Sequence, residues 1–217
     1  MSEQFDIRGG DEQAVAKAVT AAAEAIASGQ LVAVPDEAGY QLVASICDPE
    51  ATERLLQAPL RHDPVVLGSD ADSLLQWISD PAGPGELTLR LARRCWPAPV
   101  VLELNPQQTA PGGWSPAFWE GVGERQRLGV RVPAHEVPRG LLDLADSPLL
   151  ARPLPVTDAG EVVDQSIESA SVILQAGPSR YAGGDTTIRV DGQDWEVTHE
   201  GAVGAATVAR MACRVVV

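Results

Sequence analysis

Apolar residues in this chain follow two different periods, one typical of helices and one typical of buried strands. From Asp11 to Ser28 they recur every three or four residues, on a stripe formed by Val15, Val19, Ala22 and Ile26. Such a stripe predicts an amphipathic helix. The next segment, LVAVP from Leu31 to Pro35, is apolar throughout and predicts a short buried strand that the proline closes.

The same two patterns continue to the C-terminal end of the chain. They predict further helices near residues 48–57, 73–79, 87–96, 137–145, 163–171 and 204–214. They predict strands at 64–69, 99–105, 127–133 and 171–177, around Leu149, and in a hairpin formed by 186–192 and 193–201. Residues 106–124 are rich in Pro and Gly and are expected to form a loop with one helical turn around Phe118. Because helices alternate with strands and a hairpin is present as well, the expected fold class is α/β with a mixed twisted sheet.

Acidic residues dominate the charge of the chain. It contains 30 Asp and Glu against 16 Lys and Arg, a formal net charge of −14 at pH 7. A field of this sign repels phosphate backbones, so direct binding to nucleic acid is not expected. Lys17 is the only lysine, which leaves arginine as the cation for any anionic ligand.

The cysteines and the N-terminal segment indicate a cytoplasmic protein. Cys47, Cys95 and Cys213 are far apart and lack a C-x-x-C spacing, so neither a disulfide framework nor a zinc site is predicted. The first ten residues, MSEQFDIRGG, are polar and acidic. No apolar run approaches the roughly 18 residues of a membrane span, so no membrane association is expected.

General catalytic patterns are weak in this sequence. His62, His135 and His199 have no metal-ligand spacing, so no metal site is predicted from them. Asp36 and Glu37 directly follow the first buried strand, where α/β sheets place ligands. A metal hydrolase that uses these two carboxylates and a histidine is one hypothesis, and solvated loop residues are the simpler one.

Several segments, taken in order, resemble the YrdC-like family of threonylcarbamoyl-AMP synthases. LVAVPDEAGYQLVASICDPEATERLL resembles that family's strand, proline, T-x-T-x-Y-G-L loop and following helix, and PVVLGSDADSLLQWI its next strand and helix. LARRCWPAPVVLEL resembles its W-P-G-P-L-T-L-V-L segment, RLGVRVPAHEV its V-G-V-R-V-P-x-H segment, and SVILQAGPSRYAGGDTTIRVDG its D-G-G-P…E-S-T-V-V-D segment. The resemblance extends from Ala14 to Gly204. It implies a single domain over residues 1–217 with a twisted mixed sheet, flanking helices and a large concave cavity.

Members of this family condense threonine, bicarbonate and ATP into threonylcarbamoyl-AMP and pyrophosphate, a step in tRNA modification. The resemblance therefore implies a nucleotide-binding site and, if the chain is active, the use of ATP and Mg²⁺. Such a site needs cations for the triphosphate, and hydroxyl or amide groups for the adenylate and the threonine.

Most of the groups that would serve this chemistry are replaced. The T-x-T-x-Y-G loop stands as Asp36-Glu37-Ala38-Gly39-Tyr40-Gln41, which loses both threonine hydroxyls and retains the tyrosine. The K-x-R-P position falls on Gln57-Ala58-Pro59, with Arg61 two residues later. The S-x-N position falls on Pro153-Leu154-Pro155 or, in another alignment, on Thr157-Asp158-Ala159, and the R-P-G position on His199-Glu200-Gly201.

A few residues retain the chemistry that the resemblance implies. Arg131 and the pair Thr186-Thr187 are candidate nucleotide-binding residues, with Arg61 as a cation that would have to reach in from a shifted loop. Tyr40, Asp36 and His199 are candidates for the lining of a substrate pocket. No catalytic residue and no metal ligand is predicted.

Two functions remain open at this point. The first is a degenerate or repurposed family member, a pseudoenzyme whose cavity binds another small molecule or a partner protein. The second is an active, divergent synthase in which Arg131, Thr186 and Arg61 hold ATP. Each charge-assisted contact contributes about 1.5–3 kcal/mol, so the number of lost contacts favours the first. Convergence of Asp36, Glu37 and Glu200 on the pocket would exclude a triphosphate.

Overall fold

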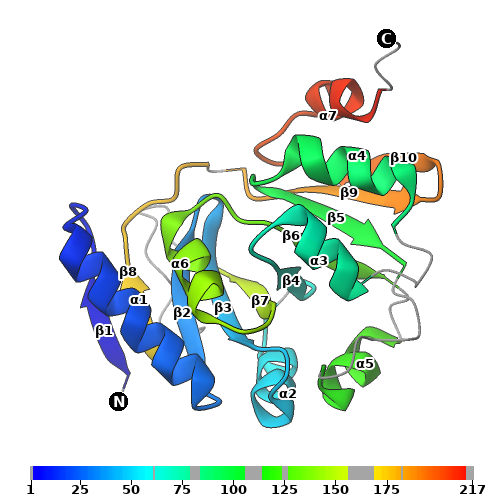
Figure 1. The fold of residues 1–217 in the computed structure, drawn as a ribbon. Coiled ribbons are helices and arrows are strands. Elements are labelled where there is room, and N and C mark those ends of the chain that lie inside the picture. The colour runs from blue at the N-terminus through cyan, green and yellow to red at the C-terminus, as the bar shows by residue number, and fades with distance from the viewer. Residues whose placement is uncertain are drawn as a thin grey trace.

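A twisted sheet of ten strands forms the centre of the computed structural model, which describes residues 2–60, 62–78, 84–105, 114–123, 127–155, 169–181 and 183–213. The order of the strands across the sheet is β1-β8-β2-β3-β7-β4-β6-β5-β9-β10 (Figure 1). The strands are β1 (Glu3–Asp6), β2 (Leu31–Asp36), β3 (Gly39–Ser45), β4 (Val65–Leu67), β5 (Val100–Leu104), β6 (Leu128–Arg131), β7 (Leu149–Leu154), β8 (Ala170–Gln175), β9 (Thr186–Asp191) and β10 (Asp194–His199). The helices are α1 (Glu12–Ala27), α2 (Pro49–Gln57), α3 (Ala71–Ile78), α4 (Glu86–Cys95), α5 (Pro116–Gly123), α6 (Glu136–Leu144) and α7 (Ala205–Ala212).

Parallel and antiparallel pairs coexist in this sheet. The pairs β1/β8, β2/β8, β4/β6 and β5/β9 are parallel, whereas β2/β3, β3/β7, β4/β7, β5/β6 and β9/β10 are antiparallel. The mixed α/β class expected from the sequence is therefore confirmed, as is the predicted hairpin of β9 and β10.

Helices cover both faces of the sheet, which explains why β2 is apolar at successive positions. Leu31 and Ala33 belong to a core cluster shared with α2, α4, α5 and α7. Val32 and Val34 belong to a second cluster with α1 and α6 on the opposite face. Successive side chains of a strand point to opposite faces, so a strand covered on both sides is apolar throughout.

The ends of the first helices follow the signals in the sequence. The carboxylate of Asp11 accepts a hydrogen bond from the backbone N of Gln13 at the start of α1 (3.2 Å), and that of Asp48 accepts from Ala51 N at the start of α2 (2.8 Å). Gly29, with φ of 73°, follows the end of α1 in the left-handed conformation that glycine favours.

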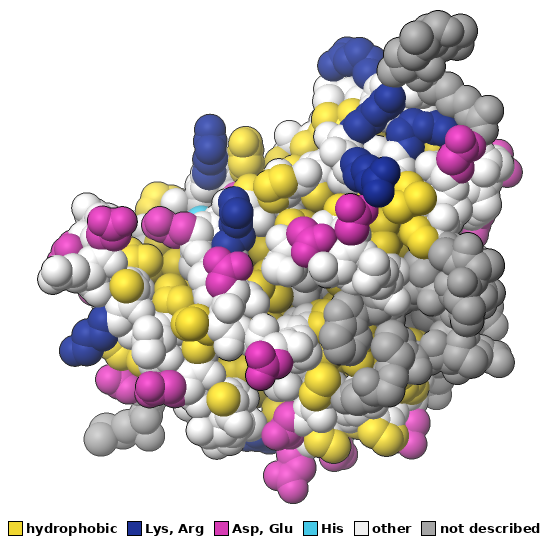
Figure 2. All heavy atoms as spheres, viewed as in Figure 1, with side chains coloured by type: hydrophobic (Ala, Val, Ile, Leu, Met, Phe, Trp, Pro, Cys, Tyr) yellow, Lys and Arg dark blue, Asp and Glu magenta, His cyan; other side chains and the backbone are white. Residues whose placement is uncertain are grey.

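Arginines of α4 hold the last helix in place. Arg90 donates to Ala212 O (2.9 Å), and Arg94 donates to Met211 O (2.8 Å) and Cys213 O (2.6 Å), so these cations satisfy carbonyls at the end of α7. Figure 2 shows dark blue side chains gathered over this upper part of the molecule.

Four segments differ from the expectations. Residues 39–45 form β3, and residues 3–6 form an edge strand, β1, although neither was predicted as a strand. Around Phe118 the chain forms a helix of eight residues, α5, instead of one turn. Most of the helix expected at 163–171 lies outside the described residues. Its last two residues, Ala170 and Ser171, belong to β8.

The cysteines remain thiols. Cys47, Cys95 and Cys213 are free, and burial raises the pKa of the Cys95 thiol to about 11. Among the described helices none is long and apolar enough to cross a bilayer.

Candidate ligand-binding site

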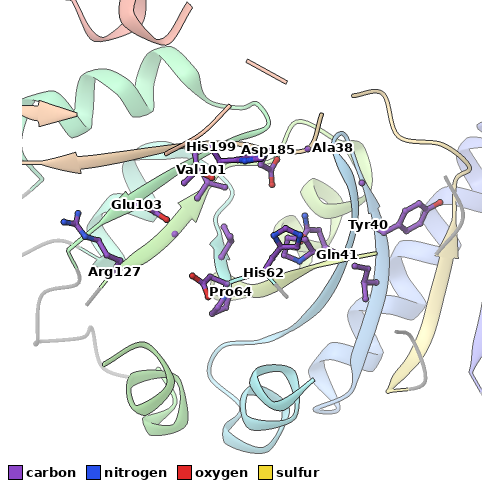
Figure 3. Close-up of a pocket in the computed structure, with 18 of the residues that line it drawn as sticks. Ala38, Tyr40, Gln41, His62, Pro64, Val101, Glu103, Arg127, Asp185 and His199 are labelled. Atoms are coloured by element: carbon purple, nitrogen blue, oxygen red, sulfur yellow. The ribbon is translucent and has the colours of Figure 1, made fainter. Parts of the chain in front are cut away.

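A cavity of about 580 Å³ opens between the β2–β3 turn, the strands β5, β6, β7 and β9, and the segment before β4 (Figure 3). Gly129 of β6 helps to keep this space open. A Cβ atom at Gly129 would lie 3.1 Å from Val101 Cγ1 and 3.4 Å from Val65 Cγ2, and all three residues line the cavity. The polar residues that line it are Gln41, His62, Asp63, Glu103, Arg127, Asp185, Thr187, Arg189 and His199.

Arg131, the strongest candidate for a phosphate-binding cation, is fully buried and already paired with carboxylates. Its Nη2 donates to Asp36 Oδ2 and its Nη1 donates to Asp185 Oδ1. Glu37 Oε1 lies 4.0 Å from Nη2. Burial lowers the pKa of Arg131, while the charge of Asp185 opposes that shift. Burial likewise raises the pKa of Asp185, and Arg131 opposes it. The guanidinium is therefore neutralised within the protein.

Glu37 occupies a second place where an anion could bind. Its two carboxylate oxygens accept hydrogen bonds from Ala134 N and His135 N, both at 3.0 Å. These amides precede α6, and free N–H groups at the start of a helix attract anions. Glu37 is 4% exposed, so this anion site is filled by the protein's own side chain.

The two threonines of the Thr186-Thr187 pair have different roles. The buried hydroxyl of Thr186 donates to Val203 O (2.8 Å) and accepts from Gly201 N (3.0 Å) and Val203 N (2.9 Å). It holds the segment that leads into α7. Thr187 is half-buried and lines the cavity.

Of the three candidates for the lining of a substrate pocket, Tyr40 and His199 line the cavity and Asp36 does not. The Tyr40 hydroxyl donates to Gly177 O (3.0 Å) and accepts from Ala176 N (2.9 Å), and Figure 3 shows the ring directed away from the cavity. Asp36 is 1% exposed and points to Arg131, whereas His199 is exposed and lines the cavity. Arg61 and the alternative Thr157-Asp158-Ala159 lie outside the described residues.

The exclusion of a triphosphate that was expected from convergence of Asp36, Glu37 and Glu200 does not apply. These three carboxylates do not converge on the cavity. Asp36 and Glu37 turn into the protein, and Glu200 is exposed and does not line the cavity. The carboxylates that do line it are Asp63, Glu103 and Asp185.

Both arginines of the cavity wall are also paired. Arg127 Nη2 lies 2.9 Å from Asp191 Oδ2, and Arg189 Nη1 lies 2.7 Å from Glu196 Oε1. Arg189 Nε is also 3.4 Å from Glu103 Oε2. The cavity is therefore not a basic surface.

Two residues that sequence reasoning did not single out shape this site. Arg152 of β7 is buried and donates to the backbone carbonyls of Leu55, Leu56, Ala58, Leu60 and His62, at distances from 2.5 to 3.1 Å. It thereby fixes the segment that carries His62 and Asp63 into the cavity wall. The sequence signal for this role of Arg152 is the presence of an arginine in the otherwise apolar strand LLARPL. A cation in a buried strand needs hydrogen-bond partners.

Gln41 is the second such residue. It is 4% exposed, lines the cavity, and its Nε2 donates to Asp36 Oδ2 at 3.2 Å. It stands where the family motif has glycine.

Comparison with known proteins identifies the family. A family model for Sua5, YciO and YrdC proteins, described as "Telomere recombination", matches residues 24–201. The chain belongs to this family. It is 29% identical to a threonylcarbamoyl-AMP synthase of Pyrococcus abyssi over 183 residues. The aligned region covers 80% of this chain and 50% of that relative. The chain is 28% identical to a putative threonylcarbamoyl-AMP synthase of Mycobacterium tuberculosis, over 97% of this chain and 95% of the relative.

Solved structures of the family have the same fold. The P. abyssi Sua5 structure complexed with L-threonine has a TM-score of 0.75 at 22% identity, covering 97% of this chain and 61% of that one. The Escherichia coli YciO structure has a TM-score of 0.70 at 22% identity, covering 96% and 99%. The chain thus spans only about half to three fifths of the P. abyssi relative, but nearly all of YciO.

Proposed function

We propose that this chain is a repurposed member of the family, whose cavity binds a small molecule other than ATP. The observation that carries this proposal is the internal pairing of Arg131 with Asp36 and Asp185. A phosphate could reach this guanidinium only by displacing a buried carboxylate, which would then be left without its partner.

The other anion-binding groups support the same proposal. The amides before α6 bind Glu37, the hydroxyl of Thr186 is used by Gly201 and Val203, and Arg127 and Arg189 are ion-paired. A triphosphate in the cavity would instead face Asp63, Glu103 and Asp185.

The residues also fit Mg²⁺ poorly. In the described part of the chain, no three His, Cys, Asp or Glu side chains gather in a way that could hold a metal ion. Asp36 and Asp185 are both ion-paired with Arg131. A metal hydrolase that uses Asp36 and Glu37 is disfavoured as well, because Asp36 is paired with Arg131 and Glu37 accepts from the amides before α6.

Calorimetric titration with ATP, Mg²⁺ and L-threonine tests the proposal. We expect no heat of binding at ATP concentrations up to about 1 mM. We also expect no release of pyrophosphate when bicarbonate is added. The threonylcarbamoyl-AMP synthase of P. abyssi, titrated under the same conditions, serves as the positive control.

An active synthase is the alternative, because the relatives named above carry that activity in their names. A micromolar affinity for ATP together with pyrophosphate release would establish that alternative. Thr187→Val, which changes a side chain of the cavity wall, should then weaken ATP binding, whereas Thr20→Val on the exposed side of α1 should not.

A further inference from the structure

The cavity contains a buried hydrogen-bond acceptor that the protein does not use. Gln41 Oε1 is buried and accepts no hydrogen bond from the described residues. The residue lines the same cavity as His62 and Pro64, and Figure 3 shows it among the labelled residues of the wall. Buried polar atoms are nearly always paired in native proteins, so an unpaired acceptor in a cavity wall points to a ligand with a donor.

The orientation of the Gln41 amide follows from its neighbour. Nε2 donates to Asp36 Oδ2 at 3.2 Å. A carboxylate offers only acceptors, so the reversed amide would place two oxygens against each other. Asp36 is in turn fixed by Arg131. The ion pair therefore holds the oxygen of Gln41, and not its NH₂ group, free for a ligand.

The charges around this acceptor favour a cation. Among the described residues, carboxylates of the wall and of its immediate neighbours outnumber the guanidiniums: Asp36, Glu37, Asp63, Glu103, Asp185, Asp191 and Glu196 against Arg127, Arg131 and Arg189. Such an excess attracts positive charge and disfavours anions. Two donors of the wall, Arg127 Nη1 and Arg189 Nε, have no hydrogen-bond partner among the described residues. Arg189 Nε lies 3.4 Å from the Glu103 carboxylate, and Arg127 lies toward the opposite side of the cavity from Gln41 in Figure 3.

We infer that the ligand of this cavity is a small organic amine, whose ammonium N–H donates to Gln41 Oε1 and whose charge is balanced by this excess of carboxylates. This inference rests on the proposed function, because it names the class of molecule that replaces ATP. Gln41 acts as a specificity-determining residue of that site.

Three molecules of similar shape test the charge requirement: n-butylamine, n-butanol and butyrate. Binding is measured by titration of ¹⁵N-labelled protein at pH 7, following the side-chain amide of Gln41 and the backbone amides of Gly129 and Gly184. We expect saturable shifts of these signals with the amine and none with butyrate. The alcohol should bind at least about tenfold more weakly than the amine, since charged hydrogen bonds are the stronger ones.

Substitution tests the role of Gln41. Gln41→Met keeps the length of the side chain and removes the acceptor, and should weaken amine binding at least about tenfold. Gln57→Met is the matched control, because Gln57 is exposed on α2 and bonds to Glu53 outside the cavity. It should leave amine binding unchanged. The Gln41 amide signal of the wild-type protein gives the same information if Gln41→Met does not fold.

Each outcome decides a separate point. If n-butylamine causes no saturable shift, or shifts only residues outside the cavity, the inference is overturned while the absence of ATP binding still stands. Equal binding of the amine and of butyrate overturns the charge argument. Micromolar binding of ATP overturns the proposed function, and the inference with it.

Discussion

Arg131 lies between two carboxylates that are distant from it in the chain, Asp36 at the end of β2 and Asp185 just before β9. A buried guanidinium is tolerated because both partners are present, and the removal of one leaves an uncompensated charge in the core. The same residues that lower the affinity for phosphate therefore contribute to the integrity of the fold.

The exchange Asp36→Asn should show this contribution. It keeps the shape of the side chain and removes its charge, and we expect the free energy of unfolding in urea to fall by about 3 kcal/mol. Asp6→Asn is the control, because the ion pair of Asp6 with Arg8 is more than half exposed on both sides and should contribute little. Equal effects of the two exchanges would show that burial does not strengthen the pair.

His135 makes stability depend on pH. Its Nδ1 accepts a hydrogen bond from Val137 N (3.2 Å) as the N-cap of α6, which requires the neutral ring. Burial lowers the pKa of His135 from its ordinary 6.5, although the charges of Glu37 and Glu136 oppose the shift. Because the unfolded chain takes up the proton first, the stabilising contribution is complete above pH 6.5 and is lost as the pH falls through the lower folded value.

Urea unfolding between pH 8 and pH 5 measures this effect. The free energy of unfolding of the wild type should decrease below about pH 6.5, and His135→Asn should reduce this slope, since Asn is a good N-cap that does not titrate. An unchanged slope in His135→Asn would assign the pH dependence to other groups.

From the sequence, several residues of the site could be predicted, but not the ion pairs and hydrogen bonds that they form. Arg131, Thr186 and Asp36 are candidates from the sequence; in the structure Arg131 is paired with Asp36, whereas the Thr186 hydroxyl bonds to Gly201 and Val203. The sequence could not show that Asp36 and Glu37 turn inward, because that depends on the two-residue turn between β2 and β3. Gln41 and Arg152 were missed because each is significant only through contacts made across the sheet.

At the level of elements, the hydroxyl group of Thr186 anchors the segment that leads into α7, in addition to the arginines of α4. Thr186 connects the start of β9 with Gly201 and Val203, directly before α7. A Cβ atom at Gly201 would lie 2.5 Å from the carbonyl oxygens of Gly184 and Asp185, so the two segments are in close backbone contact.

Thr186→Val should therefore loosen α7. The exchange preserves volume and leaves the part-buried amides of Gly201 and Val203 without the Thr186 hydroxyl, at a cost of about 1–3 kcal/mol. Amide hydrogen exchange should become faster in residues 201–213. Thr187→Val is the matched control and should leave this exchange unchanged, because Thr187 lines the cavity and the amides of Gly201 and Val203 donate to Thr186.

The elements with a strong period were predicted well, and those that depend on pairing were not. α1 and β2 follow directly from their apolar patterns. β1 contains EQFD, with only one partly buried residue, and exists because it pairs with β8. β3 was hidden by its resemblance to a loop motif. Trp114, Phe118 and Trp119 pack against one another, with ring centroids 5.0–5.6 Å apart, and this cluster extends the expected single turn to the whole of α5.

For the whole molecule, the net charge of −14 predicts a dependence of stability on salt. Figure 2 shows acidic side chains spread over the visible face, while cations gather near α4 and α7. Raising NaCl from about 0.01 M to about 1 M shortens the screening length from about 30 Å to about 3 Å, which reduces repulsion within the folded protein.

We therefore expect the melting temperature to rise with NaCl, by several degrees over this range. KCl at equal ionic strength should give the same rise, which separates screening from the binding of a particular ion. A melting temperature that falls with salt would mean that surface ion pairs stabilise the protein more than its net charge destabilises it.

Arg152 has a consequence for how this protein can change over evolutionary time. It donates to five backbone carbonyls between Leu55 and His62. Every residue type carries a backbone carbonyl, so these hydrogen bonds do not depend on the side chain at an exposed position such as His62, whereas Leu55 is fixed in the core. Because His62 lines the cavity, its substitution can exchange the chemical group offered to a ligand while Arg152 still holds the backbone, so one buried arginine makes new specificities accessible by single mutations.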